Sequence, residues 1–167
     1  MNRLSLPLSS LHNRNDFSCG NDMLDNYLKL QANQDIKRKL TACFVLIENN
    51  SDIIQGYYTL SNNSIPLNDI PTKIQKRLPS SYTSIPTILI GRLAIEKKFQ
   101  GKGIGKILLI DALNRCFEIS KNIGSFAVIV DPIDQSAESF YNKYGFIKLH
   151  DSGKMFLAMK TVGQLFE

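Results

Sequence analysis

Apolar residues at three- and four-residue intervals mark the first predicted helix of this 167-residue chain. Leu24, Tyr27, Leu28 and Ala32 would share one face of a helix, because their spacing follows its 3.6-residue turn. Two aspartates fall in the first turn and the basic triplet Lys37-Arg38-Lys39 falls at the end, a charge order that complements the helix dipole. The pattern predicts a helix over residues 21–40.

Dense or alternating apolar runs predict the strands. Residues 41–48 and 52–61 are rich in β-branched and aromatic side chains, and the Asn49-Asn50-Ser51 segment between them predicts a hairpin. Residues 87–95, TILIGRLAI, are apolar except for Gly91 and Arg92, so we expect a strand buried on both faces. Residues 125–131, SFAVIVD, predict a second buried strand.

The other elements alternate along the second half. A glycine-rich turn opens a long helix that ends near residue 121, a short helix covers 135–144, and closing strands fall within 145–149 and 154–160. Residues 68–81 are a proline-punctuated loop with room for a short helix. A hairpin followed by alternating strands and helices predicts a mixed-sheet α/β or α+β fold. Without repeats or linkers, residues 1–167 are predicted to form a single domain.

Composition narrows the class of protein. At 43% hydrophobic and 21% charged residues the chain is predicted to be globular, and it has no apolar run long enough to span a bilayer, so no membrane partner is expected. The first apolar stretch is short and broken by Pro7, so we expect no signal peptide. Three distant cysteines without C-x-x-C spacing indicate reduced thiols and a cytoplasmic location.

The net charge of +5 is concentrated in three clusters. Five basic residues and one acidic residue lie between Arg92 and Lys106, and two further clusters are Lys37–Lys39 and Lys73–Arg77. A single lysine is most often part of a solvated surface. Three clusters together raise the expectation of contact with a polyanion.

The glycine-rich turn, QGKGIGK, does not match two well-known phosphate-binding patterns. A P-loop would need glycine at position 100 and serine or threonine at position 107, where the chain has Gln100 and Ile107. A G-x-G-x-x-G dinucleotide fingerprint would need its third glycine at Lys106 or Leu108. Both nucleotide patterns are therefore excluded.

A third pattern, Q-x-x-G-x-G, is met by Gln100, Gly103 and Gly105. It brings backbone N–H groups at a helix start close to one anion, with Lys102 and Lys106 adding positive charge. A tight strand-to-helix turn without a ligand would use the same glycines. The hexapeptide alone leaves both interpretations open.

The turn and a later segment together resemble the core of the GNAT superfamily of acetyl-CoA-dependent N-acetyltransferases. The matching stretches are ILIGRLAIEKKFQGKGIGKILLIDAL and FAVIVDPIDQSAESFYNKYGF, within residues 87–149. The resemblance implies an N-acetyltransferase with a mixed, mostly antiparallel sheet flanked by helices, and acetyl-CoA as cofactor. The acetyl-CoA-binding residues it implies are Leu93, Ala94, Ile95, Gln100, Gly101, Lys102, Gly103, Ile104, Gly105, Lys106, Ser136 and Phe140.

The same resemblance implies a catalytic tyrosine. Tyr141 would donate a proton to the leaving thiolate, and the backbone N–H of Leu93 or Ile95 would polarise the acetyl carbonyl. The alternative role for Tyr141 is a core aromatic. No general base is identified: residues 88–90 are apolar, and Glu96 is expected to be a surface charge beside the lysines. Two isolated histidines make no metal site, so no metal is expected.

A narrower resemblance links the first half to the GNAT-type toxins of toxin–antitoxin pairs. It rests on residues 16–29, 56–61 and 90–95, in which the pattern C-G-x-x-x-L-D-x-Y-L begins at Cys19. These toxins acetylate the amino group of charged tRNA and are silenced by a ribbon-helix-helix antitoxin. The resemblance implies aminoacyl-tRNA as substrate, such an antitoxin as partner, and a homodimer as one option. Candidate tRNA contacts are Lys29, Lys37, Arg38, Lys73, Lys76, Arg77 and Arg92.

Several questions stay open at this point. Arg92, a lone charge in an apolar run, fits a phosphate contact or a structural salt bridge equally well. The acceptor is alternatively a small amine or a protein N-terminus, and a non-catalytic GNAT-fold binding protein is a second alternative. The aminoacyl preference, the oligomeric state and the existence of an antitoxin are not fixed by the sequence.

Overall fold

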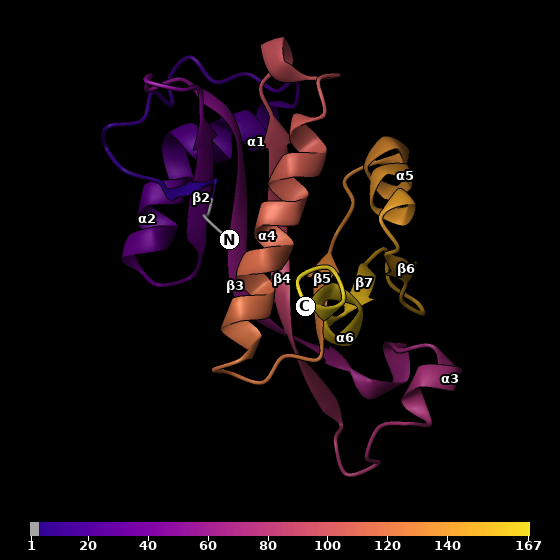
Figure 1. Cartoon of the computed structure of the whole chain (residues 1–167). Coiled ribbons are helices and arrows are strands. Elements are labelled where there is room, and N and C mark those ends of the chain that lie inside the picture. Colours follow the sequence, from indigo (N-terminus) through magenta and orange to yellow (C-terminus); the bar gives the residue numbers. More distant parts are fainter. Residues whose placement is uncertain (1–3) are drawn as a thin grey trace. The chain divides into compact units, whose positions relative to one another are not determined.

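Seven strands lie in a sheet of order β1-β2-β3-β4-β5-β7-β6 in the computed structural model, which describes residues 4–167 (Figure 1). The strands are β1 (Leu6–Pro7), β2 (Ala42–Ile47), β3 (Ile54–Pro66), β4 (Ser84–Ile95), β5 (Ala127–Val130), β6 (Ile147–Lys148) and β7 (Met155–Ala158). β4 pairs with β5 in parallel, whereas the β1–β2, β2–β3, β5–β7 and β6–β7 pairs are antiparallel. The predicted mixed, mostly antiparallel sheet with flanking helices is confirmed.

The chain divides into two compact units. Unit 1 comprises the residues up to Ser61 together with Gly91–Ala112, and unit 2 comprises Asn62–Ile90 together with Leu113–Glu167. The chain passes between them within β3, within β4 and within helix α4 (Ile104–Ser120). No helix within residues 4–167 is long and apolar enough to cross a membrane.

The first predicted helix is present in unit 1, with a change of pitch in its middle. It consists of α1 (Asp22–Asn26), a π-helical segment η1 (Tyr27–Gln31) and α2 (Ala32–Lys37). The side chain of Asn21 caps α1 by accepting a hydrogen bond from the Leu24 N–H. Its buried face packs with Val45 and Tyr57 of the β2–β3 hairpin, and the Tyr57 hydroxyl donates to the Leu24 carbonyl at 2.7 Å.

The amino-terminal segment of unit 1 is held by a buried carboxylate. Asp111 on α4 accepts hydrogen bonds from the Leu4 N–H at 2.9 Å, from the Tyr58 hydroxyl at 2.9 Å and from the Ser5 hydroxyl. β1 follows and pairs Leu6 with Val45 of β2. This short strand has no recognisable pattern in the sequence, and we did not predict it.

Unit 2 has its own apolar core. Ile129 of β5, Phe156 of β7 and Ile85 of β4 are buried in it, together with Ile65 before the predicted central loop and Ile70 within that loop. That loop contains a 3₁₀ turn, η2 (Leu67–Asp69), and the expected short helix, α3 (Thr72–Gln75). Helices α5 (Gln135–Lys143) and α6 (Met159–Gly163) complete the unit.

Two expectations about strands are wrong. The closing strand ends at Ala158, because Met159 already begins helix α6, where Met159 and Val162 are buried. β4 is not buried on both faces throughout: Gly91 is exposed, and Arg92 and Leu93 are only half-buried. That second part of β4 belongs to unit 1, so the strand offers a partly open surface where the sequence predicts the donor site.

Candidate active site

The glycine-rich turn connects β4 to α4 through a 3₁₀ turn, η3 (Lys97–Phe99). Gly101 and Gly103 have φ angles of +75° and +79°, in the left-handed region that favours glycine. A Cβ at either position would meet no atom within 4 Å, so the glycines serve the backbone conformation and leave open space outside it. α4 begins at Ile104, which puts Gly105 and Lys106 in its first turn. The turn therefore presents free helix-start N–H groups to an open, positively charged surface.

Gln100, the first residue of the predicted motif, has its side-chain amide turned inward. The Nε2 group donates to the carbonyl oxygens of Cys19 and Ile95, both at 2.8 Å. These bonds tie the turn to the segment before α1 and to the end of β4. Gln100 thus holds the turn in place, and its amide hydrogens are not available to a ligand.

The backbone of β4 in unit 1 has a defined orientation. A Cβ on Gly56 of β3 would lie 2.8 Å from the Ala94 carbonyl oxygen, so that carbonyl faces β3. Because neighbouring residues of a strand turn their N–H groups to opposite edges, the Leu93 and Ile95 N–H groups face away from β3. The β4–β5 ladder ends at the Ile90–Val130 pair, before these residues. The predicted carbonyl-polarising N–H groups therefore lie beyond the end of that ladder.

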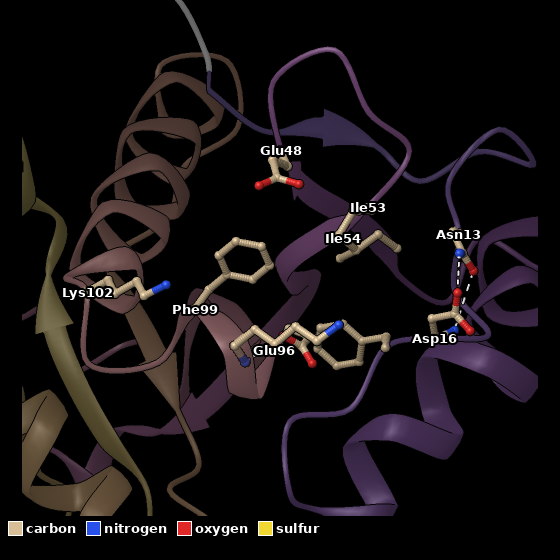
Figure 2. A pocket seen from close by; sticks show the side chains of 10 residues that line it. Asn13, Asp16, Glu48, Ile53, Ile54, Glu96, Phe99 and Lys102 are labelled. Atoms are coloured by element: carbon tan, nitrogen blue, oxygen red, sulfur yellow. Dashed lines mark hydrogen bonds between the residues drawn. The ribbon is translucent and has the colours of Figure 1, made fainter.

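Lys102 of the turn also lines a cavity of about 390 Å³ in unit 1 (Figure 2). Carboxylates of Asp16, Glu48 and Glu96 line it together with the amines of Lys98 and Lys102. Three acidic groups against two basic groups make it a poor site for a pyrophosphate.

Glu96 corrects an expectation. We predicted a surface charge, but its exposed fraction is only 7%, and its Oε2 accepts a hydrogen bond from the Lys98 N–H at 2.6 Å. The carboxylate caps the 3₁₀ turn η3, in which the Lys98 N–H would otherwise be unsatisfied. Its role in the structure is to shape the turn.

Tyr141 lies on α5 in unit 2, in the aromatic cluster that the sequence indicates. Its ring contacts Phe140 and Phe146 edge-on, with centroid distances of 5.3 and 5.4 Å. Burial raises the pKa of its hydroxyl above the ordinary value, so the phenol keeps its proton at neutral pH. Within residues 4–167 the hydroxyl has no hydrogen-bond partner, and it is not fully enclosed either. It is therefore free to donate to a ligand.

The predicted donor-site residues fall into two groups. Unit 1 brings together residues 93–95 and 100–106, while Ser136, Phe140 and Tyr141 share α5 in unit 2. The first turn of α5 is capped by the Asp134 carboxylate, which accepts from the Ala137 N–H at 2.8 Å. Ser136 is exposed and Phe140 half-buried. Their roles toward a cofactor stay predictions.

The predicted tRNA contacts also fall in both units. Lys29, Lys37, Arg38 and Arg92 belong to unit 1, and Lys73, Lys76 and Arg77 lie on or just after α3 in unit 2. All except the half-buried Lys29 and Arg92 are exposed. Within residues 4–167, no cluster of His, Cys, Asp and Glu side chains is arranged to hold a metal ion.

Sequence reasoning missed the structural use of the C-G-x-x-x-L-D-x-Y-L segment. Asp25 is buried and its Oδ1 accepts the Cys19 N–H at 2.8 Å, which holds the loop before α1. The Cys19 carbonyl is then free to accept from Gln100. The aspartate six residues after the cysteine is the available signal, but from the sequence it serves only the helix dipole and the toxin-like motif, with no hydrogen-bond partner assigned.

Comparison with known proteins places the chain among acetyltransferases. The family model described as an acetyltransferase (GNAT) domain matches residues 20–156. A tRNA-acetylating toxin of Mycobacterium tuberculosis (strain ATCC 25618 / H37Rv) is 33% identical over 150 residues, which cover 89% of this chain and 87% of that protein.

Two solved structures are also similar. AtaT complexed with acetyl-methionyl-tRNAfMet gives a TM-score of 0.89 at 28% identity, and the match covers 98% of both chains. AtaTR bound with acetyl-CoA gives a TM-score of 0.85 at 27% identity, covering 98% of this chain and 97% of that one.

Proposed function

This chain belongs to the GNAT acetyltransferase family, and we propose that it transfers an acetyl group from acetyl-CoA to the α-amino group of aminoacyl-tRNA, which blocks translation. The observation that carries the choice of acceptor is the likeness to the M. tuberculosis tRNA-acetylating toxin, which extends over 89% of the chain. Residues 1–167 would act as one N-acetyltransferase domain.

The turn of unit 1 fits the pyrophosphate of acetyl-CoA. Gly101 and Gly103 leave room for phosphate oxygens at the backbone, and the start of α4 supplies N–H donors. Lys102 and Lys106 add charge, and Lys at a helix start is otherwise unfavourable by roughly 0.5 kcal/mol. Acetyl-CoA, when bound there, supplies an acetyl thioester that an amine can attack.

Two groups of the protein would assist the acetyl transfer, one at the acetyl oxygen and one at the leaving sulfur. The N–H groups of Leu93 and Ile95, at the edge of β4 away from β3, would donate to the acetyl oxygen as negative charge develops on it. Tyr141 would donate a hydrogen bond, and finally its proton, to the departing sulfur. Burial keeps the phenol protonated at neutral pH, although the raised pKa also makes it a weaker acid.

No carboxylate base is proposed on β4, because Ile88 and Ile90 are buried apolar residues and Glu96 is committed to its turn. The α-amino group of an aminoacyl ester needs little help, since an α-amino group has an ordinary pKa of about 7.7–8 and is partly neutral at physiological pH. We therefore propose that its proton is lost to water.

Two further proposals follow from this function. The protein would act in the cytoplasm, where charged tRNA is found, and its three cysteines are free. A ribbon-helix-helix antitoxin would silence it, as in the toxins that it resembles. An adjacent reading frame that encodes such a small protein would support this partner.

The decisive test compares the wild-type protein with Tyr141→Phe on charged tRNA and acetyl-CoA. Loss of the proton donor should lower kcat by about 10²–10⁴-fold while leaving the KM for acetyl-CoA nearly unchanged. Tyr144→Phe is the matched control, because Tyr144 is half-buried in the same aromatic cluster.

Two results would contradict the proposal in different ways. If the wild-type protein acetylates no aminoacyl-tRNA and does not arrest growth when induced, the acceptor is wrong. If the wild type is active and Tyr141→Phe matches it in kcat, the acceptor stands and the role of the tyrosine is wrong.

A further inference from the structure

Arg92 has no carboxylate partner, although it is half-buried within a strand. Its guanidinium carbon lies 3.5 Å from the centroid of the Tyr27 ring, and it forms no ion pair or side-chain hydrogen bond with any other residue of 4–167. A guanidinium over an aromatic ring keeps its N–H groups, which lie in its own plane, available to other acceptors. The structure thus decides against the structural salt bridge that the sequence left open.

Arg92 and Tyr27 line a pocket of about 300 Å³ in unit 1. Its rim is apolar: Met23 and Leu30 are 62% and 72% exposed, unusually large values for long apolar side chains. Asn26 and Gln31 complete the lining. The pocket therefore combines one unpaired cation with an exposed apolar rim.

An irregular helix forms part of the wall of this pocket. Residues 27–31 form a π-helix, a rare conformation that is often found at functional sites. The Tyr27 hydroxyl is enclosed near the Asp35 carboxylate, so Tyr27 offers the pocket its ring and not its hydroxyl.

The pocket is next to the predicted site of acetyl transfer along the chain. Arg92 directly precedes Leu93, whose N–H is proposed to polarise the acetyl carbonyl, and consecutive Cα atoms are about 3.8 Å apart. A ligand anchored on Arg92 would hold its reactive group close to the thioester. A ligand that suits this pocket carries a phosphate for Arg92, an apolar group for the rim and an amine that can accept the acetyl group.

We propose that this pocket binds the aminoacylated 3′-terminal nucleotide of tRNA, with a backbone phosphate on Arg92 and the aminoacyl side chain against Met23 and Leu30. The enzyme accordingly prefers apolar aminoacyl groups to acidic ones. This inference rests on the proposed function and adds the position of the acceptor end and the residues that select it.

The proposed contact between Arg92 and a tRNA phosphate is tested by measuring tRNA binding in the absence of catalysis. Arg92→Gln should weaken binding of deacylated tRNA about 10- to 100-fold and reduce the slope of log affinity against log salt by about one. The Kd for acetyl-CoA, measured by calorimetry, should stay unchanged. Lys160→Gln is the matched control, since it removes one exposed charge outside the pocket.

Arg92→Lys is a second variant that keeps the test informative if Arg92→Gln fails to fold. It keeps the charge but loses the planar fork, so it should bind tRNA more tightly than Arg92→Gln and less tightly than the wild type. If both variants fold, as judged by circular dichroism, and bind tRNA with wild-type affinity and salt slope, the phosphate contact is refuted.

The selectivity part is tested by kcat/KM over a panel of methionyl-, leucyl- and aspartyl-tRNA. The wild type should favour the apolar aminoacyl groups, and Leu30→Ala or Met23→Ala should each reduce that preference by up to about tenfold. Ile123→Ala is the control, because Ile123 is similarly exposed at 65% and lies outside the pocket.

The possible failures are distinguishable. A wild type that acetylates no aminoacyl-tRNA overturns the proposed function and this inference with it. A wild type that acetylates all three charged tRNAs equally, or whose preference is unchanged in Leu30→Ala and Met23→Ala, leaves the function standing and overturns the pocket assignment.

Discussion

The backbone conformation at Gly103 shapes the turn that is proposed to hold the pyrophosphate of acetyl-CoA. With a φ of +79°, any residue with a Cβ would be strained there, although the space around it is open. Packing gives no reason for glycine at this position. The conformation itself, which turns the chain into α4, gives that reason.

Gly103→Ala should therefore weaken acetyl-CoA binding more than it affects folding. The left-handed conformation costs alanine about 1–2 kcal/mol, and relief of that strain would rotate the N–H groups away from the ligand, so a Kd increase of about tenfold or more is expected. Calorimetry with acetyl-CoA measures it. Gly124→Ala is the control, since Gly124 also has open space but no positive φ.

At the scale of elements, the turn, the end of β4 and the segment before α1 are joined by a short chain of hydrogen bonds. Asp25 accepts from the Cys19 N–H, the Cys19 carbonyl accepts from Gln100, and the Lys97 N–H donates to the Ser18 carbonyl at 2.8 Å. The segment that resembles the toxins and the turn that resembles all GNAT enzymes are thus mechanically connected.

Gln100→Ala should loosen both segments at once. It removes two hydrogen bonds worth about 1 kcal/mol each, so the free energy of unfolding should fall by about 2 kcal/mol and the Kd for acetyl-CoA should rise severalfold. Chemical denaturation and calorimetry measure the two effects. An equal response from Gln164→Ala, an exposed glutamine just after the last helix, would show that the two hydrogen bonds of Gln100 are unimportant.

The sequence predicts most elements because their signals are local. Leu24, Leu28 and Ala32 are spaced for a helix, and the hairpin of β2 and β3 has its turn residues between two strand-like runs. The π-helix at Tyr27–Gln31, the two-residue strand β1 and the start of α6 have no local signal, because they depend on packing with distant residues.

In the candidate site, too, features with a local sequence signal are predictable and features that depend on distant contacts are not. Gly103 and Tyr141 belong to short motifs, so the sequence identifies them as candidates, whereas it indicates neither the cap formed by Glu96 nor the cation over Tyr27. These two features depend on contacts that no residue spacing reveals.

At the scale of the whole molecule, burial should keep all three cysteines unreactive. Burial raises the pKa of the Cys19 thiol to about 11 and those of Cys43 and Cys116 to about 12. At pH 8 the thiolate fraction of Cys19 is then about a thousandth, and the other two are lower still. The thiolate is the form that reacts with alkylating reagents.

Iodoacetamide at pH 8 should therefore label the folded protein slowly and the denatured protein rapidly at three sites per chain. Because the pKa values are raised, labelling of the folded protein should accelerate as pH increases toward 11. Mass spectrometry counts the adducts. One site that reacts within minutes in the folded protein would mean that the pKa of its thiol is not raised as described.

The Asp111 contacts also limit how early unit 1 can be completed while the chain is being synthesised. The Leu4 N–H and the Ser5 hydroxyl find their acceptor 107 and 106 positions later in the chain, and unit 1 is completed only by residues 91–112. A nascent chain on the ribosome cannot form unit 1 before Asp111 has emerged. The protein proposed to halt translation would itself have to be translated past residue 112, about two-thirds of its 167 residues, before unit 1 with its glycine-rich turn could be completed.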